Sequence, residues 1–192
     1  MAKTASTMLP LGTIAPNFQL RDTNGRIVSL TDFAGQPALV MFLCNHCPYV
    51  KHIQAELVKL GRDYAPRGVR IVAISSNDAT HYPADGPALM AAEAMAAGYH
   101  FPYLYDESQT VAQAYRAACT PDFFLLNPSH CLVYRGQLDA SRPGNGIPVT
   151  GEDLRSALEA LLTGKAISTK QTPSLGCNIK WRPGNEPDYF TV

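Results

Sequence analysis

Cys44 and Cys47 are separated by two residues, and they lie at the point where a short apolar run ends and a helical pattern begins. The run 36–43 predicts a strand that is covered on both faces, as in the middle of a parallel or mixed sheet. After the cysteines, apolar residues recur at three- and four-residue steps through Tyr64, the spacing of one buried helical stripe. Residues 69–74 predict a second buried strand, joined to the first by a right-handed crossover. The chain is therefore predicted to be an α/β protein with two thiols at a strand-to-helix junction.

Turn residues and periodicity predict the remaining elements. Asn24-Gly25 readily adopts the positive φ angles of a tight turn, so it predicts an N-terminal β-hairpin. The full set of expected elements is a hairpin of 18–20 with 26–30, a loop over 77–87, a helix over 88–97, a helix from Ser108 to about 118, a second hairpin of 122–127 with 131–135, and a helix over 154–162 opened by a capping box of Thr150 and Asp153.

The length of 192 residues suits one domain with additions at its ends. We expect an N-terminal extension over 1–11, a domain over 12–165 and a tail over 166–192. Prolines in the tail predict an irregular backbone, whereas its apolar side chains would gain by leaving water. The tail is therefore predicted to pack on the body of the protein or on a second subunit. Those side chains belong to Ile179, Trp181, Tyr189 and Phe190.

Charge and hydropathy exclude several classes of partner. Lys and Arg number 16 and Asp and Glu number 16, so no net basic field gathers nucleic acid or an anionic membrane surface. The apolar run before the dithiol falls far short of the ~20 residues of a membrane-spanning helix, and the N-terminus lacks the apolar core of a leader peptide. We expect a cytoplasmic protein that binds neither nucleic acid nor membrane. The odd number of cysteines, five, disfavours a disulfide-stapled secreted scaffold.

The position of the dithiol is typical of a thioredoxin-like redox site. A sulfur must be ionised to attack a disulfide, and the N–H groups and dipole at a helix start stabilise a thiolate. Cys44 is better placed to meet solvent and is expected to attack, whereas Cys47 lies about one helical turn further on and is expected to resolve. His46 is expected to lower the pKa of Cys44 through a hydrogen bond or positive charge. Asn45 and Pro48 are candidate substrate-binding residues.

A structural zinc half-site is an alternative interpretation of this Cys-x-x-Cys motif. The sequence offers no second cysteine pair of this kind, so redox chemistry is favoured. Taken alone, His46 and His52 would be typical of a solvated helix face. We therefore expect neither a resident metal nor a cofactor.

Four further segments stand out: GTIAPNFQL over 12–20, SLTDFAG over 29–35, FPYLYD over 101–106 and TPDFFL over 120–125. In that order they resemble segments of the alkyl hydroperoxide reductase and thiol-specific antioxidant family, within the thioredoxin superfamily. The likeness covers about residues 12–165. CNHCPYV over 44–50 and GCNIKW over 176–181 resemble a peroxiredoxin-like subgroup of that family.

The resemblance implies a thioredoxin-like fold, with a central mixed β-sheet flanked by helices. It also implies that Thr120-Pro121 is a cis-proline loop that faces the dithiol and offers backbone groups to an extended substrate. Two departures bear on the chemistry. Peroxiredoxins carry Thr or Ser three residues before the attacking cysteine, and Met41 stands there in this chain. Thioredoxins carry a buried carboxylate on the strand before the dithiol, and 36–43 contains none, so proton transfer at Cys47 is expected to be slower or to run through water or the neighbouring histidine.

The other three cysteines differ in their expected roles. Cys119 precedes the cis-proline loop, so it is either an additional redox residue near Cys44 or a small buried strand residue. Cys131 begins an apolar strand and is expected to be structural. Cys177 lies on the tail, where it is a candidate second resolving thiol within or between chains.

Three functions remain open on these grounds. The first is a thiol–disulfide oxidoreductase in which Cys44 attacks and Cys47 resolves, acting on a disulfide-bearing protein or a small thiol and drawing on a thioredoxin- or glutathione-type reductant. The second is a thiol peroxidase in which Cys44 reacts with peroxide and Cys47 or Cys177 condenses with the sulfenic acid. The third is a copper carrier that uses the two thiols and a distant histidine. A homodimer is an open alternative to a monomer.

Overall fold

Strand β4 (Ala38–Phe42) is the centre of the fold, and all five of its residues are buried. In the computed structural model, which describes residues 3–190, β4 pairs in parallel with β5 (Arg70–Ser75) and antiparallel with β8 (Asp122–Leu126). Helix α1 (Pro48–Tyr64) joins β4 to β5. The predicted strand, helix and parallel strand are confirmed, and burial on both faces explains the near-continuous apolar run.

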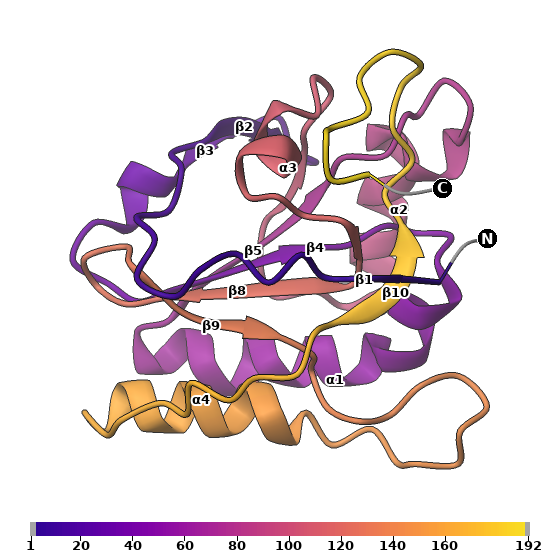
Figure 1. Ribbon diagram of the computed structural model, residues 1–192. Helices are drawn as coiled ribbons and strands as arrows, with labels where there is room; N and C mark the ends of the chain where they lie inside the picture. Colours follow the sequence, from indigo (N-terminus) through magenta and orange to yellow (C-terminus); the bar gives the residue numbers. More distant parts are fainter. Residues whose placement is uncertain (1–2, 191–192) are drawn as a thin grey trace.

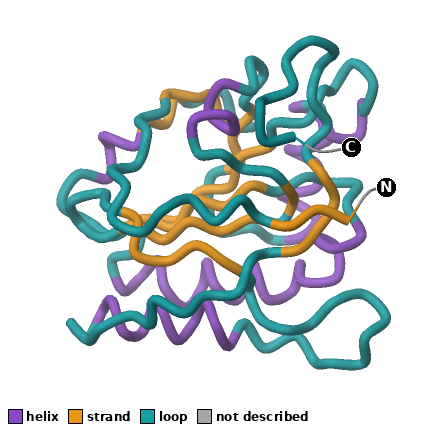
Figure 2. Tube along the Cα trace, in the orientation of Figure 1, coloured by secondary structure: helices purple, strands orange, loops and turns teal. Residues whose placement is uncertain are grey.

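Around this centre lies a seven-stranded mixed sheet in the order β3-β2-β6-β5-β4-β8-β9 (Figures 1 and 2). Both predicted hairpins are confirmed: β2 pairs antiparallel with β3, and β8 pairs antiparallel with β9. Gly25 has φ +83 in the first turn, a conformation that costs glycine little. The outer strands are β2 (Gln19–Asp22), β3 (Ile27–Ser29), β6 (Tyr103–Tyr105) and β9 (Leu132–Gly136).

Helices cover both faces of the sheet, with α1 and α4 below it and α3 above it in Figure 1. The alternation of side chains along the strands produces two apolar clusters, one per face. One cluster receives α1, α2 and α4, and the other receives α3, η1 and the tail. No helix within residues 3–190 combines the length and apolar character needed to cross a membrane. The bounds are η1 (Leu30–Phe33), η2 (Ala65–Arg67), η3 (Pro83–Asp85), α2 (Pro87–Ala97), α3 (Thr110–Ala114) and α4 (Glu152–Leu162).

Two expected helix details are wrong. The helix expected from Ser108 to about 118 is only the five-residue α3, because the chain turns into the left-handed region at Arg116, φ +50, and continues as β7 (Cys119–Thr120). Helix α4 has no capping box, because Gly151 is its N-cap and Asp153 accepts a hydrogen bond from Gln137 instead.

The tail is not irregular throughout, which corrects the expectation drawn from its prolines. Residues Leu175–Asn178 form β10, which pairs antiparallel with β1 (Lys3–Ala5) on one side and with β7 on the other. This separate three-stranded sheet is visible in Figure 1, where β10 lies beside β1. Beyond it, Ile179 and Trp181 are buried against the body of the chain. The strand forms because both of its edges find backbone partners.

Asp122, the first residue of β8, has no solvent exposure. Burial raises the pKa of its carboxyl from the ordinary 3.8 to about 7. Between those values the folded state keeps a proton that the unfolded state has released, so the free energy of unfolding falls as the pH rises through this window. The loss is roughly 4 kcal/mol at ~1.36 kcal/mol per pKa unit. We expect Asp122→Asn to lack this loss when urea unfolding is followed from about pH 4 to about pH 8.

Asp188 supplies the matched control for this prediction, because its side chain is 82% exposed. Asp188→Asn should retain the wild-type pH dependence. An Asp122→Asn variant that loses stability with rising pH as steeply as the wild type would show that Asp122 is already ionised in the folded protein at low pH.

Candidate active site

The two thiols of the Cys-x-x-Cys motif lie in the short junction between the end of β4 and the start of α1. Cys47 is the N-cap residue of α1 and Pro48 is its first residue, a position where the missing N–H costs little. The side chains of Cys44 and Cys47 are hydrogen bonded to each other. All five cysteines of the chain lie within residues 3–190, and each is a thiol rather than half of a disulfide. The two sulfurs are therefore close enough to exchange a proton.

The loop around Thr120-Pro121 faces this dithiol, as the family resemblance implied. The Thr120–Pro121 peptide bond is cis. The hydroxyl Oγ1 of Thr120 lies 3.2 Å from Sγ of Cys44, and the Cys47 thiol donates to the Thr120 carbonyl oxygen at 3.2 Å. Both sulfurs thus contact the same residue, which lies far from them in the sequence.

Solvent access to Cys44 differs from the expectation. Cys44 is 2% exposed and Cys47 is fully buried. Thr120 lies against the Cys44 sulfur, and a carboxylate oxygen of Asp85 lies within 4.8 Å of it. In this structure a substrate disulfide reaches Cys44 only after a local opening.

The His46 ring bonds a buried carboxylate, and a ring nitrogen also lies within 4.8 Å of the Cys44 sulfur. Its Nδ1 lies 2.5 Å from Oδ2 of Asp85, and the ring stacks on Tyr82 with 5.4 Å between centroids. Asp85 is fully buried and also accepts hydrogen bonds from the backbone N–H of Asn45 at 2.7 Å and from Nδ2 of Asn77 at 2.8 Å. Asp85 therefore fixes the backbone between the two cysteines.

Asp85 is the site residue that sequence reasoning missed. It lies in η3, inside the segment expected to be a loop, and no periodicity or motif distinguishes it from an exposed turn carboxylate. The strand before the dithiol indeed carries no carboxylate, but the fold brings one to the same site from another segment. Asn45 is held by the same segment, because its Nδ2 donates to the Ala84 carbonyl at 2.7 Å and its Oδ1 accepts from Tyr103.

Among the three contacting thiols of Cys44, Cys47 and Cys177, here called the sulfur cluster, Cys47 is the one whose pKa is lowered. Hydrogen bonds from the thiols of Cys177 and Cys44, together with backbone N–H groups that include that of Val50, lower the pKa of Cys47. The hydrogen bond to Cys47, burial and the negative charge of Asp85 raise the pKa of Cys44. His46 bonds Asp85 and is not among the largest causes that shift the pKa of Cys44, so its expected lowering of that pKa stays a prediction.

The remaining cysteines lie in three different environments. The side chain of Cys177 is buried and hydrogen bonded to Cys47. Cys119 is fully buried, its thiol donates to the Pro121 carbonyl at 3.6 Å, and burial raises its pKa well above the ordinary value. Cys131 is half-buried on the far side of the second hairpin's turn. Cys177 is therefore the one among these three that contacts the dithiol.

One group of side chains within residues 3–190 has the spacing of metal ligands, namely Cys44, His46 and Asp85. It offers one sulfur, one nitrogen and one carboxylate oxygen, and its histidine already bonds its carboxylate. Cu(I) prefers soft thiolate and thioether ligands, which a hard carboxylate is not. This donor set differs from the one of the copper carrier considered from the sequence, which is Cys44, Cys47 and a distant histidine.

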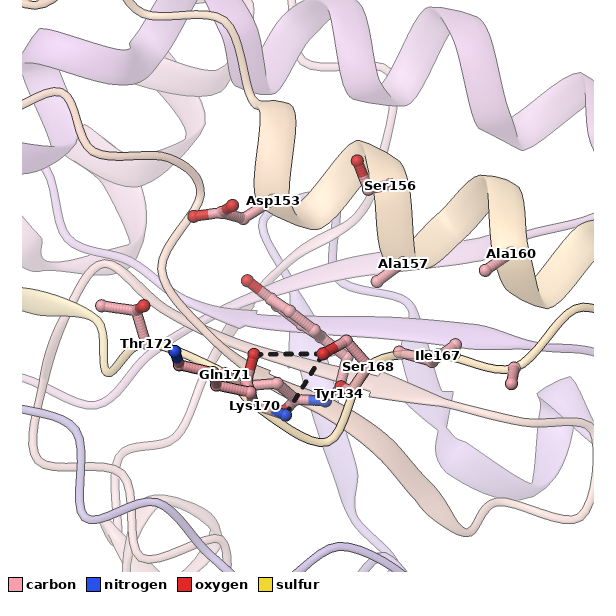
Figure 3. A pocket seen from close by; sticks show the side chains of 11 residues that line it. Tyr134, Asp153, Ser156, Ala157, Ala160, Ile167, Ser168, Lys170, Gln171 and Thr172 are labelled. Atoms are coloured by element: carbon pink, nitrogen blue, oxygen red, sulfur yellow. Dashed lines mark hydrogen bonds between the residues drawn. The ribbon is translucent and has the colours of Figure 1, made fainter.

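A cavity of about 260 Å³ lies between α4 and the segment around residues 166–172 (Figure 3). Its lining includes Tyr134, Asp153 and Gln171, and no cysteine is among the lining residues. The redox site is a separate place in the molecule, next to the cis-proline loop.

Two curated relatives carry names from redox chemistry. The thiol-disulfide oxidoreductase ResA of Bacillus subtilis is 29% identical over 124 residues, which are 64% of this chain and 64% of that protein. The chloroplastic peroxiredoxin Q of Oryza sativa subsp. japonica is 33% identical over 72 residues, which are 37% of this chain and 33% of that protein. The match therefore spans less than two thirds of either relative's length.

Solved structures agree with the layered architecture. An uncharacterized conserved protein of Geobacillus kaustophilus is 55% identical, with a TM-score of 0.94 over 96% of this chain and 98% of that chain. The thioredoxin domain of a thiol-disulfide oxidoreductase of Bacteroides vulgatus is 22% identical, with a TM-score of 0.57 over 66% of this chain and 88% of that chain. The predicted thioredoxin-like fold is confirmed.

The family follows from the sequence match and from the fold together. The model of the AhpC/TSA family matches residues 11–135, a region that contains the dithiol, Asp85 and the cis-proline loop. Tail strand β10 lies outside this region. The chain belongs to the AhpC/TSA family, in the thioredoxin superfamily.

Proposed function

We propose that this protein is a thiol–disulfide oxidoreductase in which Cys44 attacks the substrate disulfide and Cys47 resolves the mixed disulfide. The observation that carries the proposal is the contact of two hydrogen-bonded thiols, at the start of α1, with the loop of Thr120-Pro121. The name of the ResA relative supports the same reaction class.

The hydrogen bond between the two thiols supplies the first proton transfer. Because the pKa of Cys47 is lowered and that of Cys44 is raised, Cys47 is the member of the reduced pair that ionises first, and it then gives up its hydrogen bond to the Thr120 carbonyl. The Cys44 proton passes to Cys47, and the Cys44 thiolate then attacks a substrate sulfur and breaks the substrate disulfide. The released thiolate takes the proton back from Cys47. Cys47, again ionised, attacks the Cys44 sulfur and expels the second substrate thiolate, so two electrons have moved from the dithiol to the substrate.

Access distinguishes the two roles. Cys47 contacts Cys44, Cys177 and the Thr120 carbonyl and is fully buried. Cys44 contacts the Thr120 hydroxyl and retains a small exposed fraction of 2%. Local opening around Cys44 is therefore the step that admits the substrate.

The proposed substrates are disulfide-bearing proteins or small disulfides, and the proposed reductant is of the thioredoxin or glutathione type. Asn45 and Pro48 lie beside the sulfurs and are proposed to contact the bound substrate. We also propose a cytoplasmic location, because a dithiol that is turned over by thiol reductants belongs in a reducing compartment.

The test of this proposal is an equilibrium with a glutathione redox buffer. We expect oxidation to one disulfide per chain, with the Cys44-Cys47 form seen by mass mapping as the loss of two hydrogens within the tryptic peptide of residues 27–51. Its midpoint also gives the direction of electron flow, since ~−270 mV is typical of a reductant and ~−120 mV of an oxidant. A dithiol that stays reduced across this whole range contradicts the proposal.

A thiol peroxidase remains the second candidate because of the Thr120 hydroxyl. Met41 is fully buried and cannot orient a peroxide, but Oγ1 of Thr120 lies 3.2 Å from the Cys44 sulfur. The peroxiredoxin Q relative supports this alternative. Peroxide consumption that requires Cys44 and is abolished by Thr120→Val, in a protein that fails to exchange with glutathione, would favour it over the first proposal.

A further inference from the structure

Strand β10 runs directly across the cis-proline loop that faces the dithiol. Cys177 is the register partner of Thr120, and Asn178 is the partner of Cys119. The approach is so close that a Cβ on Gly176 would lie 2.0 Å from the Thr120 carbonyl oxygen. Glycine is thus required at this position, because any side chain would push the strand away from the loop. The edge that the loop would offer to an extended substrate is already paired with the protein's own tail.

The pairing brings a third sulfur to the dithiol. The Cys177 thiol and the Cys177 backbone N–H are both hydrogen bonded to the sulfur of Cys47. Cys177 is 2% exposed. Cys47 therefore lies in contact with both Cys44 and Cys177.

We propose that Cys177 is a third redox thiol, which replaces Cys44 as the disulfide partner of Cys47. The inference rests on the proposed function, because the Cys44-Cys47 disulfide that it consumes is the product of that reaction. It adds a second disulfide state, Cys47-Cys177, in which Cys44 is again a thiol.

The exchange step needs no outside reactant. The Cys177 thiolate attacks the Cys47 sulfur of the Cys44-Cys47 disulfide, a bond forms between Cys177 and Cys47, and the bond between Cys47 and Cys44 breaks. The leaving thiolate of Cys44 accepts the proton that Cys177 gave up, by way of solvent or the Thr120 hydroxyl. One disulfide is lost and one is formed, so the chain is neither oxidised nor reduced by the step.

The choice of Cys47 as the attacked sulfur follows from contact. Cys177 is hydrogen bonded to Cys47, whereas Cys44 is the sulfur next to Asp85 and Thr120. The Cys47-Cys177 disulfide links β10 covalently to the start of α1. In this state Cys44 is again a thiol, although the chain still holds one disulfide. An enzyme in this state can capture a second substrate disulfide at Cys44 but cannot resolve it with Cys47.

Trypsin separates the sulfurs into peptides that distinguish the two states. Cys44 and Cys47 lie together in the peptide of residues 27–51, and Cys177 lies in the peptide of residues 171–180. A Cys44-Cys47 disulfide stays within one peptide, whereas a Cys47-Cys177 disulfide joins the two. The probe is one equivalent of diamide, followed by an acid quench that stops exchange and by N-ethylmaleimide, which labels the remaining thiols.

For Cys44→Ser we expect the joined peptide 27–51/171–180 as the main oxidised product. For the oxidised wild type we expect two products, the single-peptide Cys44-Cys47 disulfide and the same joined peptide with N-ethylmaleimide on Cys44. In Cys177→Ser the labelling of Cys44 after oxidation should fall at least about tenfold, because Cys47 then has only Cys44 as a partner. A purely structural Cys177 would leave the labelling of Cys44 unchanged.

Cys131→Ser is the matched control, because it removes a thiol that does not contact the dithiol, and it should give the wild-type pattern. Absence of the joined peptide from both Cys44→Ser and the oxidised wild type, while the single-peptide Cys44-Cys47 disulfide forms, overturns this inference and leaves the proposed function standing. Absence of the single-peptide disulfide in every variant and in the wild type overturns the proposed function itself.

Discussion

Cys44→Ser is expected to lower the rate of insulin disulfide reduction at least about 10³-fold, as loss of a catalytic nucleophile does in other enzymes. Serine cannot form a disulfide, and Cys47 is fully buried. The residual rate should be that of the added reductant alone. Cys131→Ser should keep the wild-type rate, since its thiol lies outside the sulfur cluster.

Cys47→Ser should fail at a different step. The hydrogen bond to Cys47 is the largest cause that raises the pKa of Cys44, so its removal makes Cys44 easier to ionise. Cys44 then still attacks, but the mixed disulfide with the substrate is not resolved and accumulates. Mass spectrometry of the intact protein after mixing with oxidised glutathione measures this adduct. Turnover by Cys47→Ser at the wild-type rate would contradict the assigned roles of the two sulfurs.

Asp85→Ala is expected to reduce the free energy of unfolding by about 3 kcal/mol, because it strands buried hydrogen-bond donors of Asn45 and Asn77. Asp85→Asn keeps an acceptor oxygen and should cost less. Its informative effect is electrostatic. The negative charge of Asp85 contributes to the raised pKa of Cys44, so Asp85→Asn should shift the pH dependence of Cys44 alkylation to lower pH.

Asp78→Asn is the matched control for the electrostatic effect. Asp78 is also a buried carboxylate that contacts a histidine, but its partner is His81 and not His46. We expect Asp78→Asn to leave the alkylation profile of Cys44 in place. A shift of equal size in both variants would mean that Asp85 acts through general loosening of the segment and not through its charge on Cys44.

The central strand, the helix after the dithiol and the parallel strand that follows were predictable because each depends on local spacing. An apolar run bounded by turn residues, and apolar residues at three- and four-residue steps, are properties of a few consecutive positions. The two hairpins were predictable for the same reason. The family resemblance added the cis-proline loop, and the Thr120 contacts with both sulfurs agree with it.

The tail was harder to predict because its strand exists only through its partners. Nothing in the sequence of β10 favours a strand over an irregular segment, and its prolines lie on either side of it. Pairing with β1 and β7 satisfies its backbone groups, and those two strands come from distant parts of the chain. The sequence therefore indicated Cys177 as a candidate redox residue, but it did not predict that Cys177 lies against Cys47.

By itself, the sequence determined which thiols this protein has, the strand-to-helix junction that holds two of them and the order of elements around that junction, because periodicity and turn chemistry are local. Only the tertiary structure decided how the thiols are charged. It placed the Asp85 carboxylate next to Cys44 and the Cys177 thiol against Cys47, and hydrogen bonds and charge act through distance in space rather than along the chain.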